Sequence, residues 1–147
     1  MQKNAFIAQT QRIVAVEAGN SESVVRLDEF TQFERKLVLF AELYDVRNDI
    51  VITACDYTEI ERRLVFPDAI LTLSLHGDDL IVTTDKFARS IELSGEKDGN
   101  LFGFVFEDNF FDLLPGQVKK VKLLFNKAGV TITAKAHYSS HKTSIYG

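Results

Sequence analysis

The alternation of apolar and polar residues restricts the folds open to this chain more than any other feature. The clearest alternating runs cover residues 71–76, 101–106, 120–125 and 130–137. Side chains two positions apart lie on the same face of a β-strand, so each run can turn one apolar face toward a core. Helical spacing is rare outside one segment. The pattern predicts a chain built mainly from β-strands.

Residues that favour tight turns separate the alternating runs. They cluster at residues 18–21, 47–49, 76–79, 94–100, 115–116 and 126–129. Gly and Asn tolerate positive φ, and Pro fixes the first position of a turn. Strands that recur roughly every 8–12 residues between such turns are typical of an all-β sandwich or barrel.

Composition excludes several classes of protein. The chain has 147 residues, is 46% hydrophobic and 26% charged, and carries a formal charge of −4. A chain of this size buries about 68–70% of its surface on folding. It can therefore fold without disulfides or a structural metal. Its apolar runs of about five residues are far shorter than a membrane span, and the acidic balance argues against nucleic acid. A lone Cys55 excludes an intrachain disulfide and a cysteine-based zinc site.

The chain divides into two parts near Pro67, because a residue before proline is pushed out of helical conformation. We expect domains at 1–66 and 67–147. The first part contains one ambiguous segment, in which Phe33, Leu37 and Phe40 share helical spacing. The same stretch also fits a strand, and the following 50–53 run favours a hairpin of two strands.

Two carboxylates stand out because they flank a pair of phenylalanines. Asp108 and Asp112 enclose Phe110 and Phe111, with Asn109 beside them. A calcium loop would need oxygen ligands where Phe110 stands, and a glycosidase pair needs a geometry that spacing cannot supply. We therefore interpret the segment as a turn or bulge whose side chains bond nearby backbone amides.

No other residue set forms a catalytic or metal-binding pattern. His137 and His141 are four apart, which aligns ligands only on a helix, and His76 precedes a glycine turn. Cys55 lies in a strand pattern as a half-buried packing residue. Neither a nucleophile elbow nor a phosphate-binding glycine loop is present. We expect no catalytic residue, no cofactor and no metal.

Lysines and aromatic residues suggest two weaker binding surfaces. Lys119, Lys120 and Lys122 could attract a polyanion, but on a strand they fit a solvated face that also guards against edge pairing. A sugar platform needs an exposed flat ring. The chain has no Trp, and Tyr57, Tyr138 and Tyr146 are the remaining candidates.

One continuous segment resembles a known family. It runs Phe106-Glu107-Asp108-Asn109-Phe110-Phe111-Asp112-Leu113-Leu114-Pro115-Gly116-Gln117. It is similar to a stretch in the terminal immunoglobulin-like domain of family 2 glycoside hydrolases of the β-mannosidase branch, with Gln117 where Glu is usual. The resemblance spans about residues 69–136. It implies an immunoglobulin-like antiparallel β-sandwich whose motif forms a corner, with Phe111 buried and Asp112 bonded to backbone amides.

The first part resembles the second half of the preceding sandwich domain in this family. The resemblance is carried by residues 14–25, and residues 37–43 and 50–53 would be the last strands of that domain, so we expect a partial second sandwich. The catalytic glutamates of the family lie in an upstream (β/α)₈ barrel, and nothing in this sequence corresponds to that barrel. The resemblance therefore implies part of a glycoside hydrolase, and no enzyme by itself.

The expected function is a non-catalytic C-terminal accessory domain of a β-mannosidase-like exo-glycosidase. Its expected partners are the remaining domains of that enzyme, with a homodimer covering the partial domain in isolation. The alternative is a free-standing module that binds carbohydrate weakly or another partner, and an independent hydrolase is a third reading. A periplasmic or extracellular location follows if the parent has a signal peptide, and a cytoplasmic one otherwise.

Overall fold

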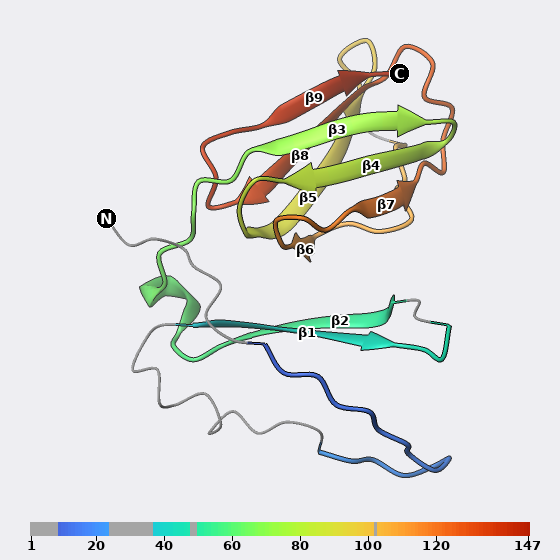
Figure 1. Ribbon diagram of the computed structural model, residues 1–147. Coiled ribbons are helices and arrows are strands. Elements are labelled where there is room, and N and C mark those ends of the chain that lie inside the picture. The colour runs from blue at the N-terminus through green and yellow to red at the C-terminus, as the bar shows by residue number, and fades with distance from the viewer. Residues whose placement is uncertain (1–8, 24–36, 48–49, 102) are drawn as a thin grey trace. The chain divides into compact units, whose positions relative to one another are not determined.

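The computed structural model (Figure 1) describes residues 9–23, 37–47, 50–101 and 103–147. The chain separates into two compact units, Met1–Leu64 and Val65–Gly147. The described residues are all-β, apart from one three-residue 3₁₀-helix (labelled η2) at Glu61–Arg63. The all-β prediction is confirmed.

The first unit contains a two-stranded antiparallel hairpin, β1 (Val38–Tyr44) and β2 (Ile50–Tyr57). Ala41 pairs with Ala54, and the register shifts by one residue beside Tyr44. The hairpin alternative for this segment is therefore confirmed for residues 38–44, whereas Phe33 lies outside the described residues. Residues 9–23 contain a turn but no strand. A partial second sandwich stays a prediction.

The described residues of the second unit form seven strands in two antiparallel sheets (Figure 1). One sheet has the order β3-β4-β7 and the other β6-β5-β8-β9. This arrangement agrees with an immunoglobulin-like sandwich. The strands are β3 (Leu71–His76), β4 (Asp79–Thr84), β5 (Ala88–Glu96), β6 (Phe111–Leu113), β7 (Lys119–Lys122), β8 (Thr131–His137) and β9 (Thr143–Tyr146).

The core of this unit follows from the alternation of its strands. In β8, Ile132, Ala134 and Ala136 are buried, while the residues between them lie on the opposite face. The same period buries Leu80 and Val82 in β4. The inward residues of the two sheets belong to one hydrophobic cluster. The apolar alternation is therefore the direct cause of the two-layer architecture.

The predicted strand over residues 101–106 is wrong. The described residues of this run form no named strand, and Phe106 alone makes an isolated bridge, to Leu123. Gly103 has a φ of +86°, which interrupts the extended backbone. The ring of Phe104 packs against the core beside Gly95, where even a Cβ atom would lie 2.6 Å from its Cγ. The alternation of apolar and polar residues in this run therefore reflects which side chains are buried. It does not indicate a strand that pairs continuously with a neighbour.

Candidate functional site

The motif at residues 108–117 forms a corner that includes β6 and leads into β7 (Figure 1). Asn109 begins this corner. Its side-chain carbonyl accepts a hydrogen bond from the amide of Leu93 at 2.7 Å, and its amide nitrogen donates to the carbonyl of Leu93 at 2.9 Å. The Asn109 side chain therefore acts as a neighbouring strand would, satisfying both backbone groups of Leu93 on β5.

Asp112 holds the next part of the corner to a bulge in β5. The pairing of β5 with β6 shifts between Ala88 and Ile91, and Ser90 in this bulge has a φ of +46°. One carboxylate oxygen of Asp112 accepts a hydrogen bond from the Ser90 amide at 2.7 Å and another from Arg89 Nη1 at 2.8 Å. The expectation that Asp112 bonds a backbone amide is confirmed. The carboxylate compensates the backbone group that the bulge removes from the ladder.

The two adjacent phenylalanines have opposite environments. Phe111 is half-buried and packs against the hydrophobic core, so its predicted burial is correct in part. Phe110 is 60% exposed and has a φ of +60°. Its amide donates to the carbonyl of Ile91 at 2.8 Å, which fixes this left-handed conformation in the corner.

The end of the corner is a tight turn over Leu114, Pro115, Gly116 and Gln117. The Gln117 amide donates to the Leu114 carbonyl at 3.1 Å, and Gly116 has a φ of +88°. Pro at the second position and a positive φ at the third are the features of a type II turn. The side-chain carbonyl of Gln117 also accepts from the Leu114 amide at 2.8 Å. Gln therefore supplies the acceptor oxygen needed at this position.

The carboxylates of the corner are both engaged with cations. Asp108 binds the ammonium group of Lys119, which also lies 5.1 Å from the centre of the Phe111 ring. Asp112 binds Arg89, as described above. Next along β7, Lys120 lies 2.7 Å from Asp79, and this hydrogen bond raises the pKa of Lys120. The arrangement stabilises a structural corner and offers two paired carboxylates, in keeping with the turn interpretation.

A second polar cluster, centred on Asp68, was not anticipated from the sequence. Its carboxylate accepts hydrogen bonds from the Ser140 hydroxyl at 2.7 Å, the Ser140 amide at 2.9 Å and the Ser139 hydroxyl at 2.9 Å. These bonds, those from Ser140 above all, lower the pKa of Asp68 to about 2. The cluster fastens the segment before β3 to the turn between β8 and β9. The residues involved are some 70 positions apart, so no local pattern marks them.

The remaining candidate residues do not come together. His76 and His137 are exposed at the ends of β3 and β8, and His141 lies on the far side of the turn that follows β8, 3.4 Å from Asp68. Cys55 is half-buried in β2 opposite Phe40. Within the described ranges, no group of three or more His, Cys, Asp or Glu side chains is placed to hold a metal ion.

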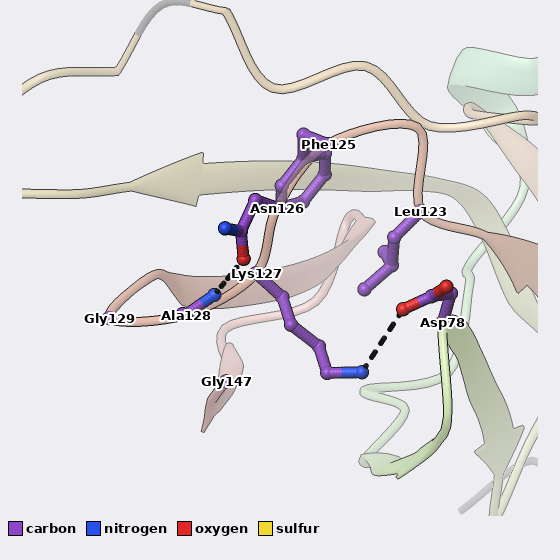
Figure 2. A pocket seen from close by; sticks show the side chains of 8 residues that line it. All are labelled: Asp78, Leu123, Phe125, Asn126, Lys127, Ala128, Gly129 and Gly147. Carbon is purple, nitrogen blue, oxygen red and sulfur yellow. Dashed lines mark hydrogen bonds and ion pairs between the residues drawn. The ribbon is translucent and has the colours of Figure 1, made fainter.

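A shallow hollow lies beside the loop between β7 and β8 (Figure 2). Lys127 crosses it to reach the Gly77 carbonyl and the carboxylate of Asp78, which lies 3.4 Å away. The side chain of Asn126 accepts from the Ala128 amide at 3.0 Å. These contacts hold the loop in place and pair the ammonium group of Lys127 with the carboxylate of Asp78. The lining residues are Asp78, Leu123, Phe125, Asn126, Lys127, Ala128, Gly129 and Gly147.

Comparison with known families gives a match that lies within the second unit. The family model described as Ig_mannosidase, an Ig-fold domain, matches residues 66–140. That range contains the corner motif and the strands from β3 to β8. No curated protein and no solved structure matches the chain. Among the described residues, no helix is long and apolar enough to cross a membrane.

Proposed function

Because the chain belongs to the Ig_mannosidase family of Ig-fold domains, we propose that it serves as a non-catalytic accessory domain of a β-mannosidase-like exo-glycosidase. The family match over residues 66–140 carries this proposal. Fold alone would not support it, because β-sandwiches host many unrelated functions. The catalytic groups would then belong to another part of the same enzyme.

The corner supports an accessory role because it makes a rigid surface. Its bends are fixed by side chains that bond the backbone of β5, including Asn109 to Leu93 and Asp112 to Ser90. Phe110 presents an exposed ring on this fixed frame. A ring carried on a fixed backbone has few torsions to lose on docking, and we propose Phe110 as the contact between this domain and the enzyme.

The size of the native polypeptide tests the proposal. An antibody against this chain would capture the protein from its source, and intact mass would be measured alongside hydrolysis of an aryl β-mannoside. We expect a species far heavier than the 16.6 kDa of this chain, with glycosidase activity. A captured species of 16.6 kDa that carries no activity and brings down no glycosidase would contradict the proposal.

A further inference from the structure

The outward face of β5, β8 and β9 presents a regular array of polar side chains. These three strands are neighbours in one sheet (Figure 1). Their inward residues, such as Leu93 and Ile132, are buried in the core. We call the opposite side the polar face. Its members are Glu92, Ser94, Glu96, Thr131, Thr133, Lys135, Ser144 and Tyr146.

Strand register places these residues in rows across the sheet. Ser94 pairs with Thr133, which pairs with Ser144. Two positions along, Glu96 pairs with Thr131, which pairs with Tyr146. Neighbouring strands lie about 4.8 Å apart, close to the length of one pyranose unit. An extended oligosaccharide lying along a row would therefore meet about one side chain from each strand per sugar.

The hydroxyl row is partly oriented before any ligand arrives. The side-chain oxygens of Thr133 and Ser144 lie 2.8 Å apart and share a hydrogen bond. One of the two hydroxyl hydrogens is used within the pair, and the other is left to donate to a ligand. Because Thr133 is β-branched and sits in a strand, its hydroxyl direction is also restricted. A sugar hydroxyl can bind such a pair at a reduced entropic cost.

Tyr146 adds a ring to the polar face. It is 72% exposed on β9, in the row of Thr131 and Glu96. Tyr138 differs, because its ring stacks on Phe66 with centroids 4.7 Å apart and planes inclined by 3°. Of the two rings, Tyr146 is the one placed to stack on the apolar face of a sugar beside hydrogen-bonding groups.

We propose that the polar face binds an uncharged, extended pyranose oligosaccharide. The face combines hydroxyls, carboxylates and one stacking ring, which match the alternating polar edges and apolar faces of such a ligand. Its charged members are Glu92 and Glu96 against Lys135, so an anionic chain is disfavoured. This inference is independent of the accessory role proposed above.

Titration of the whole 147-residue chain with mannohexaose and cellohexaose, followed by amide NMR shifts, tests the inference. We expect shifts that concentrate at residues 92–96, 131–135 and 144–146. Tyr146→Ala should weaken binding about tenfold. The pair of substitutions Thr133→Val and Ser144→Ala should weaken it by a similar factor, because two hydroxyls are lost while shape is nearly kept.

The control variant is Tyr44→Ala, which removes an exposed tyrosine from β1 in the first unit and should leave the affinity unchanged. An anionic alginate hexasaccharide should not bind. The amide spectrum of each variant establishes that it remains folded. The inference is overturned if neither neutral hexasaccharide shifts these amides, if the shifts centre elsewhere, if Tyr146→Ala binds like the unsubstituted chain, or if alginate binds equally well.

Discussion

The guanidinium group of Arg89 lies 2.8 Å from the carboxylate of Asp112, whose side chain is 12% exposed. The same carboxylate oxygen accepts the Ser90 amide in the bulge of β5. An ion pair this sheltered is sensitive to loss of one partner, because the remaining charge stays partly desolvated. The pair therefore ties the stability of β6 to that of β5.

Asp112→Ala should lower the free energy of unfolding by about 2–3 kcal/mol, because it leaves both the Arg89 charge and the Ser90 amide without this partner. Urea unfolding measures the loss. Asp112→Asn keeps an acceptor for Ser90 and should lose less. In a double-mutant cycle with Arg89→Met, a coupling energy near zero would show that the pair contributes no stability.

Two substitutions of Asn109 can distinguish the hydrogen bond that its side-chain nitrogen donates from the one that its side-chain oxygen accepts. Asn109→Asp keeps the oxygen that accepts the Leu93 amide but loses the nitrogen that donates to the Leu93 carbonyl. We expect both Asn109→Asp and Asn109→Ala to destabilise the protein by about 1–2 kcal/mol. Hydrogen exchange of the Leu93 amide distinguishes them. Protection should survive in the Asp variant and fall in the Ala variant, and equal protection in both would count against the assigned bonds.

The adjacent phenylalanines should respond differently to truncation. Phe111→Ala removes a ring packed on the core and should destabilise the protein by about 2–3 kcal/mol. Phe110→Gly removes a mostly exposed ring and relieves a positive φ, so its effect should stay within about 1 kcal/mol. Thermal unfolding compares the two. Equal losses would mean that Phe110 is also a packing residue.

The ring of Phe104 packs so close to residue 95 that only glycine fits there. Gly95→Ala would bring a Cβ atom within 2.6 Å of Phe104 Cγ, and we expect a loss of about 1–3 kcal/mol. Chemical denaturation of Gly95→Ala, Phe104→Ala and the double variant measures the coupling. The double variant should lose less than the sum of the single losses, because the smaller side chain removes the clash. Additive losses would place the strain elsewhere.

The lowered pKa of Asp68 makes the stability of the second unit depend on pH in the acidic range. Its pKa falls from the ordinary value of 3.8 to about 2 in the folded protein, chiefly through the hydrogen bonds from Ser140. A lowered folded-state pKa contributes stability that is complete above the ordinary value and is lost as the pH falls through about 2. The melting temperature should therefore fall over this window. Asp68→Asn should make the fall less steep, and identical profiles would contradict this assignment.

The alternating pattern and the turn residues determined most of the second unit. Strands over residues 71–76 and 131–137 follow from period-two burial, which needs no knowledge of partners. The turn at Pro115 and Gly116 follows from the fixed φ of proline and the positive φ open to glycine. The fold class and the corner were therefore accessible from the sequence, together with the family resemblance that the corner carries.

The tertiary structure decided what depends on contacts between distant residues. Residues 101–106 alternate as a strand does, yet the described residues of this run pair with another strand only through the isolated bridge of Phe106. The partial burial of Phe111 and the exposure of Phe110 depend on which backbone groups of β5 form hydrogen bonds to the corner. The Asp68 cluster and the rows of the polar face likewise join residues far apart in sequence. Local patterns encode which face of a strand is apolar, whereas register and long-range hydrogen bonds are fixed only when the strands pack together.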